Sequence, residues 1–442
     1  MRRPRGLNVI GYLQGELGLG EAGRRLVAAA EHADLPTATV TYTRIGARQQ
    51  HGFVERGRSE ATYDTNIICV NADQLRPLHR DLGPEVLAGR YAIGVWFWEI
   101  AFFPANLATS AELLDEIWVA SEFVRNSISP EVDKPVHVVP IPLIPPSVPA
   151  LGRAQLQLPD RFLFLFIFDY YSINARKNPI GLVEAFKRAF PRDDGPMLLV
   201  KSINGDRRRD ALARLEEAVG GRSDIRIRDG YVDADEKNAL VATCDCYVSL
   251  HRSEGLGLTM AEAMSLGKPV IATGYSGNLT FMNEENSYLV RYSLTTIPPG
   301  CDPYPPGVEW AEPDLDHAAK LMRRVYERPD EALAVGGRAR RELLTSHSLD
   351  RTAAFMEERL AAIPEERRRL LELQEPIQHA AVDVRSLPGE SLAGPGSRVT
   401  RLLRGALRKL LWPELAAQRE LDAKLVESLQ ALARELDRTA RR

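Results

Sequence analysis

Short apolar runs recur along most of this 442-residue chain, with amphipathic stretches of helical spacing between them. The runs are four to eight residues long, and most lack the alternation of apolar and polar residues that is typical of a strand with one wet face. Runs of this kind suit a parallel sheet that helices cover on both faces. We therefore predict an α/β chain with strands at 7–13, 37–42, 66–70, 91–98, 116–120, 161–168, 197–200, 224–228, 247–250 and 269–272.

A proline-rich connector divides these strands into two groups. Five prolines fall between Pro140 and Pro149, and prolines at this density prevent a helix and favour extended chain. The alternation of strands and helices restarts at Arg161. The sequence thus predicts two domains, residues 1–145 and residues 155–375, and the second should end in helices.

The last part of the chain carries two helical patterns after a polar segment. Residues 376–397 lack periodic apolar positions and are predicted to be a flexible linker. Residues 398–442 contain a basic amphipathic helix and, after Pro413, a short heptad pattern of leucines. The first pattern suits either anionic lipid or a partner protein, and the second suits either homo-oligomer formation or an unpaired helix.

Composition excludes several classes of protein. The formal net charge of -3 argues against general affinity for nucleic acid. Four cysteines without metal-ligand spacing suit a reducing cytoplasm. No apolar run approaches the roughly 18 residues that a membrane-spanning helix needs. We expect a cytoplasmic protein whose contact with the inner membrane face, if it has one, is peripheral and made by the C-terminal tail.

A glycine-rich turn follows the first predicted strand. Gly18, Gly20 and Gly23 satisfy the G-x-G-x-x-G spacing of dinucleotide-binding turns. That fingerprint expects an acidic residue after the second strand to bind the ribose, but Thr43 and Arg44 stand there. Because an arginine at this place suits a 2′-phosphate, an NADP-dependent oxidoreductase that uses this turn stays open as an alternative.

The stretch from Cys244 to Asn286 has the pattern strand, loop, helix, strand, loop. The free N–H groups at the start of such a helix stabilise an anion, and a diphosphate is the expected ligand. Glu254 and Glu262 flank this turn with seven residues between them. Two carboxylates at this separation suit two hydroxyl-bearing parts of one ligand better than a shared metal. A solvated helix with two glutamates is the alternative.

This stretch resembles the donor-binding motif of the family-4 retaining glycosyltransferases, which use nucleotide sugars. Their GT-B fold has two Rossmann-like domains that face each other across a cleft. The resemblance implies that Glu254 contacts the transferred sugar and Glu262 the ribose. It also implies that the turn holds the phosphates through Gly255, Gly257, Leu258 and Thr259, and that Gly18 and Gly20 approach them from the first domain.

The resemblance extends to residues elsewhere in the second domain. Arg176 and Lys177 are similar to the basic pair that family members place against the donor diphosphate, where cations stabilise the charge on the leaving phosphate. Tyr171 stands where many relatives have an arginine. Either Arg176 or Lys201, which is predicted at the end of a strand, compensates for that arginine, or the charge stabilisation is weaker. Tyr231 and Val232 are expected to border the nucleobase.

The sequence gives fewer indications of the residues that bind the acceptor. The run ending at Trp98 is followed by Glu99, at the strand end where such sheets bind ligands. Many family members have a histidine near this point, and this chain has none. Glu99 is therefore the candidate for acceptor contact or proton acceptance, and a partly buried glutamate bound by backbone N–H groups is the equal alternative.

These observations together predict an α/β enzyme of GT-B fold with a helical C-terminal tail. The predicted reaction is retaining transfer of a hexose, with mannose a candidate, from a nucleoside diphosphate sugar to a hydroxyl of a glycan or lipid-linked acceptor in cell-surface polysaccharide biosynthesis. No cofactor is expected. The Asp-x-Asp pairs at Asp233 and Asp314 fall at predicted helix starts, so metal-independent transfer is expected. A catalytically silent scaffold is a further alternative, and the nucleobase, sugar and acceptor stay open.

Overall fold

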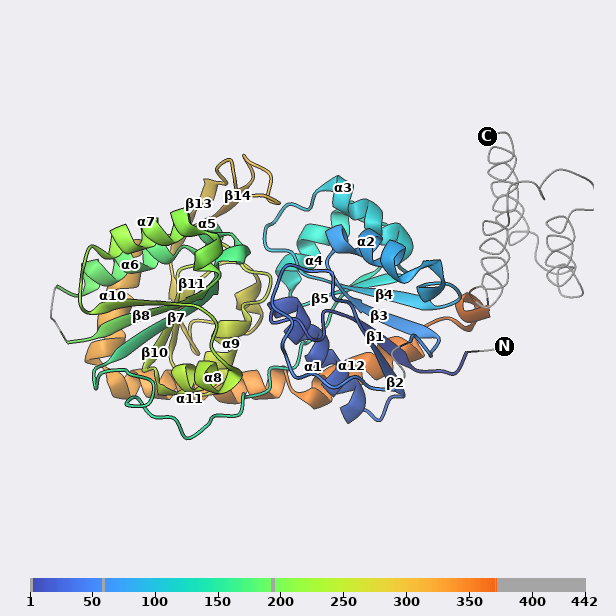
Figure 1. The fold of residues 1–442 in the computed structure, drawn as a ribbon, viewed down its shortest axis with the longest axis horizontal. Coiled ribbons are helices and arrows are strands. Elements are labelled where there is room, and N and C mark those ends of the chain that lie inside the picture. Colours follow the sequence, from blue (N-terminus) through green and yellow to red (C-terminus); the bar gives the residue numbers. More distant parts are fainter. Residues whose placement is uncertain (1–2, 58–59, 192–194, 370, 372–442) are drawn as a thin grey trace, which may run out of the picture. The chain divides into compact units, whose positions relative to one another are not determined.

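Two six-stranded sheets form the framework of the computed structural model, which describes residues 3–57, 60–191, 195–369 and 371 (Figure 1). The predicted linker and tail helices, residues 376–442, lie outside the described residues. The chain divides into two compact units. The larger unit consists of Arg5–Arg76 and Ala92–Ala361, and it contains all strand residues of both sheets except Tyr91. In the smaller unit, Arg3 donates a hydrogen bond to the Ala88 carbonyl over 3.2 Å.

The first sheet has the strand order β2-β1-β3-β4-β5-β6. β1 pairs in parallel with β2 and β3, and β5 pairs in parallel with β4 and β6. Strands β1, β3, β4 and β5 are buried along their whole length, which explains their lack of polar alternation. The elements are β1 (Leu7–Gly11), α1 (Gly18–His32), β2 (Thr37–Thr41), β3 (Thr65–Cys69), α2 (Ala72–Leu82), β4 (Tyr91–Trp96), α3 (Ala105–Ala108), β5 (Glu116–Val119), α4 (Glu122–Ile128) and β6 (Val136–Val138).

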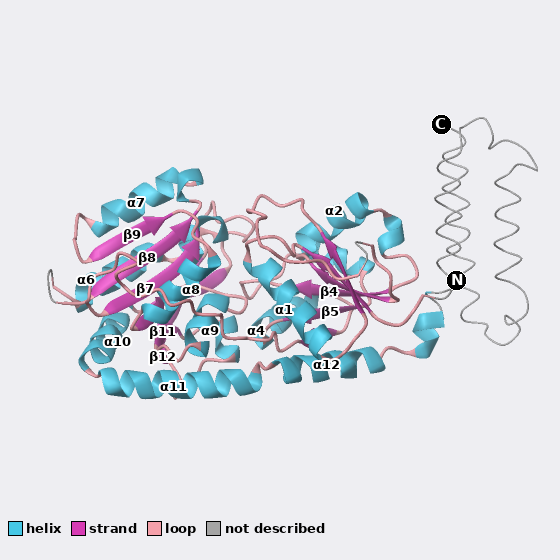
Figure 2. Cartoon of the chain, turned by 60° about the horizontal axis from the view of Figure 1, so that its bottom comes forward, coloured by secondary structure: helices cyan, strands magenta, loops and turns pink. Residues whose placement is uncertain are grey.

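The second sheet has the order β12-β11-β10-β7-β8-β9, again with parallel pairs, and β7, β8 and β9 lie side by side in Figure 2. Its elements are β7 (Leu163–Asp169), α5 (Asn174–Lys177), α6 (Pro179–Ala189), β8 (Met197–Ile203), α7 (Arg209–Val219), β9 (Ile225–Asp229), α8 (Ala234–Thr243), β10 (Cys246–Ser249), α9 (Leu258–Ser265), β11 (Val270–Thr273), β12 (Tyr288–Val290), α10 (Leu315–Glu327), α11 (Pro329–Ser346) and α12 (Leu349–Ala361).

The direction of winding reverses between β7 and β10. The chain runs outward from β7 to β8 and β9, crosses back to β10, and then runs outward the other way to β11 and β12. Helices α6, α7 and α10 pack together, and α9 packs with α8 and α11. In open α/β sheets of this kind the loops that follow the two strands at the reversal bind the ligand. Here these are the loops after β7 and β10.

Each of the ten predicted apolar runs overlaps a strand, but several predicted strand ends are wrong. β1 ends at Gly11 and β4 at Trp96, so Glu99 lies three residues beyond its strand. We expected β8 to end before Lys201, but it continues to Ile203, so Lys201 lies inside the strand. A hairpin in the second half was also not predicted. It consists of β13 (Tyr292–Thr296) and β14 (Glu309–Pro313), which pair antiparallel. The predicted C-terminal helices are confirmed as α10 to α12.

Candidate active site

The turn between β10 and α9 places Glu254 at the reversal of the sheet. Gly257 is the N-cap of α9 and has a φ of +92°, a left-handed conformation that side chains other than glycine rarely adopt. The N–H groups of the first turn of an α-helix have no partner within the helix. Leu258 and Thr259 begin α9, so their N–H groups are of this kind, and their contact with a phosphate stays a prediction.

A second loop packs closely beneath this turn. The N–H of Gly277 donates to the carbonyl of Glu254 over 2.8 Å, and a Cβ on Gly277 would lie 2.0 Å from the Gly255 carbonyl oxygen. No side chain fits there. The N–H of Glu254 donates to the hydroxyl of Ser276 over 2.8 Å. The glycine-bearing GYSGN segment therefore fixes the backbone of the Glu254 turn.

The carboxylate of Glu254 binds both predicted cations. Arg176 Nη1 lies 3.1 Å from Glu254 Oε2, and Lys177 Nζ donates to Glu254 Oε1. All three side chains are largely buried. Burial alone would raise the pKa of Glu254, but Lys177 and Arg176 outweigh it and lower this pKa to about 2. Burial lowers the pKa of Lys177, against the attraction of Glu254. The site thus has two cations around one carboxylate.

The local chain explains why the two cations reach Glu254. Arg176 and Lys177 end the one-turn helix α5, and Asn178 follows in a left-handed conformation with a φ of 54°. The Asn178 side chain accepts a hydrogen bond from the Gly181 N–H and donates one to the Leu250 carbonyl over 2.9 Å. One residue thereby caps α6 and ties the loop after β7 to the loop after β10.

The second predicted carboxylate, Glu262, has different partners. It lies on α9 and pairs with Arg25 Nη2 over 3.3 Å and with Lys237 Nζ over 2.9 Å. Glu254 and Glu262 therefore do not share a cation. At the start of the first helix, a Cβ on Gly18 would lie 3.8 Å from Leu258 Cδ1. The glycine-rich turn and the start of α9 are thus neighbours, as the donor-site hypothesis requires.

Glu99 is held by two residues that the sequence did not indicate. The Tyr304 hydroxyl donates to Glu99 Oε2 over 2.8 Å, and the Ser253 hydroxyl donates to the Glu99 carbonyl. Ser121, the N-cap of α4, also donates to the Gly255 carbonyl over 2.8 Å. Serine and tyrosine in loops gave no signal for these contacts, because the partners lie far away in the sequence.

Lys201, Tyr231 and Val232 lie apart from this cluster. Lys201 donates to the carbonyls of Ser202, over 2.7 Å, and of Gly230, and burial lowers its pKa to about 8. Among the described residues, Lys201 has no ion pair with Glu254. Its placement inside β8 thus gives it backbone partners and no contact with the other predicted cations. The loop that holds Tyr231 and Val232 follows β9.

Tyr231 is covered by a residue of the first half of the chain. The guanidinium of Arg48 lies 4.4 Å from the centre of the Tyr231 ring, and Arg48 is paired with Glu16 over 3.0 Å. The Tyr231 hydroxyl donates to Asn204 Oδ1 over 3.2 Å. The ring predicted to border the nucleobase is thus already stacked against a planar cation.

Residues 162–295 match the model of the family Glycosyl transferases group 1. The match covers less than half of the chain. It extends from the first strand of the second sheet to the hairpin and includes Arg176, Lys177, Glu254 and Glu262. The predicted family resemblance is therefore confirmed at the level of glycosyl transferases group 1.

Solved structures similar to the chain have the GT-B fold. HepE of Anabaena, in complex with UDP and glucose, superimposes with a TM-score of 0.57 at 13% identity, over 81% of this chain and 100% of the other. Sucrose-phosphate synthase of Thermosynechococcus elongatus gives 0.56 at 18% identity, over 80% and 98% of the two chains. The predicted fold, with its two Rossmann-like sheets, is confirmed by these similarities.

A curated relative matches part of the chain. Trehalose synthase of Pyrococcus horikoshii is 24% identical over 183 residues, which is 37% of this chain and 43% of that protein. The match thus spans less than half of the relative.

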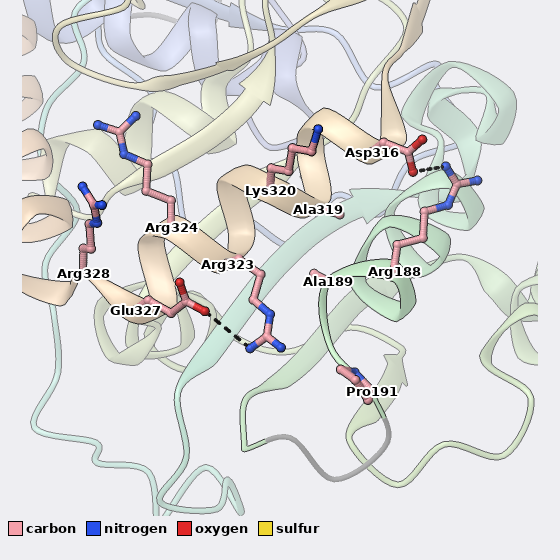
Figure 3. A pocket seen from close by; sticks show the side chains of 10 residues that line it. All are labelled: Arg188, Ala189, Pro191, Asp316, Ala319, Lys320, Arg323, Arg324, Glu327 and Arg328. Atoms are coloured by element: carbon pink, nitrogen blue, oxygen red, sulfur yellow. Dashed lines mark hydrogen bonds and ion pairs between the residues drawn. The ribbon is translucent and has the colours of Figure 1, made fainter.

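A surface hollow of the group 1 region lies away from the Glu254 cluster. Figure 3 shows it between the end of α6 and one face of α10, whereas Lys177 and Asn178 precede the start of α6. Two of its cations are paired: Arg188 binds Asp316 over 2.9 Å, and Arg323 lies 3.8 Å from Glu327. The hollow contributes no residue to the site.

The described residues contain neither a membrane-spanning helix nor a cluster of metal ligands. No helix in the described part of the chain is long and apolar enough to cross a membrane. Within the same residues, no group of three or more His, Cys, Asp and Glu side chains is arranged to hold a metal ion. Asp233 and Asp314 are N-caps of α8 and α10, as their places in the sequence predicted.

Proposed function

We propose that the protein is a retaining glycosyltransferase that moves a hexose from a nucleoside diphosphate sugar to a hydroxyl of a glycan or lipid-linked acceptor. The observation that carries this proposal is the buried contact of Glu254 with Arg176 and Lys177 at the start of α9. It lies within the segment that matches the model of the glycosyl transferases group 1 family. A role in cell-surface polysaccharide assembly, with mannose as a candidate sugar, is part of the proposal.

The donor diphosphate would bind where the cations and the helix start come together. Arg176 and Lys177 offer two charged donors to the oxygens of a diphosphate, beside the carboxylate of Glu254. The N–H groups at the start of α9 supply further donors for the phosphate oxygens. Glu254 accepts hydrogen bonds from sugar hydroxyls, and Glu262, farther along the same helix, accepts them from the ribose.

The chemistry follows from this placement. The acceptor oxygen forms a bond to the anomeric carbon as the bond from that carbon to the diphosphate oxygen breaks. The acceptor proton passes to the leaving phosphate, and Arg176 and Lys177 stabilise the negative charge that develops there. We propose that retention results from attack on the face that the phosphate leaves. The cations and the N–H groups would perform this stabilisation without a metal ion.

Support for a nucleotide-sugar donor comes from a structural relative. The solved HepE structures contain UDP with glucose or UDP-glucose, and their fold is that of this chain. The proposed site uses only main-chain N–H groups and two cations for the diphosphate, so it does not depend on the nucleobase. The base is therefore to be determined by experiment.

The test is a thermal-shift series followed by a release assay. The full chain is heated with UDP, GDP, ADP, their hexose derivatives and NADPH, and we expect one nucleoside diphosphate and its sugar to raise the melting temperature. The release of that diphosphate is then measured with and without sugar acceptors, in buffer with and without EDTA. Stabilisation by NADPH alone would refute the proposal. If EDTA abolishes the release of the diphosphate, the metal-independent part of the proposal is wrong.

A further inference from the structure

The hairpin β13–β14 is attached to the loop that carries Glu254. The N–H of Ala311 donates to the Arg252 carbonyl over 3.0 Å. The Arg252 side chain makes a two-pronged ion pair with Glu312, over 2.7 Å and 3.0 Å. Two parallel N–H···O contacts of this kind fix orientation as well as distance. The base of the hairpin is thus held two residues from Glu254.

The tip of the hairpin reaches Glu99. Tyr304, in the connection between the two strands, is 4% exposed, and its ring packs edge-on against Trp98 with the centroids 5.5 Å apart. Its hydroxyl donates to Glu99 Oε2. Glu99 itself is only partly buried, and in the described part of the chain no hydrogen bond to its other oxygen, Oε1, is found. One carboxylate oxygen is therefore fixed while the other can accept a new hydrogen bond.

The same contacts tie Glu99 to the cations. Ser253 donates to the Glu99 carbonyl through its hydroxyl and accepts a hydrogen bond from Arg176 Nη1, over 2.9 Å, through its own carbonyl. Burial alone would lower the pKa of Arg176, but Tyr304, Glu254 and Glu99 raise it. Glu99 thus lies in the same electrostatic cluster as Glu254, on the side of the hairpin.

We propose that Tyr304 is a positioning residue that holds Glu99 so that its Oε1 accepts a hydrogen bond from an acceptor hydroxyl next to the attacking one. The connection between β13 and β14, which carries Tyr304, is the wall of the acceptor site. This inference rests on the proposed transferase function. A carboxylate at this place disfavours a phosphate or carboxylate group on the entering part of the acceptor. The acceptor is therefore an uncharged sugar or polyol hydroxyl.

The first test separates acceptor binding from donor binding. Tyr304→Phe removes only the hydroxyl and leaves the ring against Trp98, and we expect the acceptor KM to rise about tenfold. The donor KM and the slow hydrolysis of donor without acceptor should not change. The matched control is Tyr292→Phe, the same change at a side chain 43% exposed on the same hairpin, which should behave as wild type. An unchanged acceptor KM in Tyr304→Phe overturns the inference.

The second test asks whether Tyr304 acts through Glu99. In a Glu99→Ala background, Tyr304→Phe should cause no further rise in acceptor KM, because its partner is gone. If Tyr304 only supports the fold, Tyr304→Phe should raise the acceptor KM further in the Glu99→Ala background. Such an additive rise would contradict a positioning role.

The third test needs no substrate. Hydrogen exchange of residues 97–103 and 297–308 should speed up in Tyr304→Phe and stay unchanged in Tyr292→Phe. Unchanged exchange in both variants would refute the contact itself. Wild-type protein that releases no nucleoside diphosphate would refute the proposed function and the acceptor role together, while the exchange result would still show whether Tyr304 holds Glu99.

Discussion

Arg25 on α1 lies 3.3 Å from Glu262 on α9 and pairs with Glu21 on its own helix over 2.7 Å. One buried guanidinium therefore serves two carboxylates. Burial alone would raise the pKa of Glu21, but Arg25 and Arg24 lower it to about 2. The first helix of the chain and the helix of the candidate donor site are joined through this cation.

Replacing Arg25 should destabilise the protein. Arg25→Met leaves Glu21 and Glu262 with one partner fewer in a buried setting, and breaking such a pair costs about 3 kcal/mol. The free energy of unfolding in urea measures the loss. Arg76→Met is the control, because Arg76 and its partner Glu112 are well exposed, and such pairs contribute less than about 1 kcal/mol. Equal losses in the two variants would show that the Arg25 pair is no stronger than a surface contact.

Removing the Lys177 ammonium should abolish transfer. Lys177→Ala takes away a cation that we expect to stabilise the leaving diphosphate, and kcat should fall about a hundredfold or more. Release of nucleoside diphosphate at saturating donor is the measurement. Lys187→Ala is the matched control, since Lys187 lies on α6 and pairs with Glu184 over 3.0 Å near the surface. If both variants keep wild-type kcat, the charge-stabilisation role of Lys177 is wrong.

The Glu254 ion pair should make stability depend on acid pH. Its pKa is lowered from 4.5 to about 2 in the folded protein, so its contribution is complete above pH 4.5 and is lost as the pH falls towards 2. The difference corresponds to about 3 kcal/mol. Unfolding in urea at a series of pH values between 5 and 2 should show a smaller pH slope for Glu254→Gln than for wild type. Identical slopes would contradict the assignment.

His347 should act in a different pH window. Burial lowers its pKa from 6.5 to about 4, so the unfolded chain takes up the proton first. Its effect on stability is absent above pH 6.5 and becomes a loss of about 3 kcal/mol as the pH falls to 4. His347→Gln should remove this part of the slope. An equal slope between pH 6.5 and 4 in His347→Gln and in wild type would contradict this prediction.

Local pattern alone accounts for most of the secondary structure. The buried strands are visible as unbroken apolar runs, because a strand covered on both faces has no polar side. Asp233 and Asp314 also act as N-caps at the helix starts where the sequence placed them. The β13–β14 hairpin was missed because Tyr292 and Leu294 are exposed, so its first strand lacks an apolar core face.

The amino-acid sequence by itself determined the parallel α/β strands, the turn at Glu254 and the presence of a basic pair at Arg176 and Lys177. Only the tertiary structure decided that this pair meets Glu254 across 77 residues and that Tyr304 binds Glu99 across 205. The physical reason is that helix and strand formation depend on neighbours along the chain. Which charged side chains meet depends on the order in which distant strands pair, and that order reverses at β7 and β10.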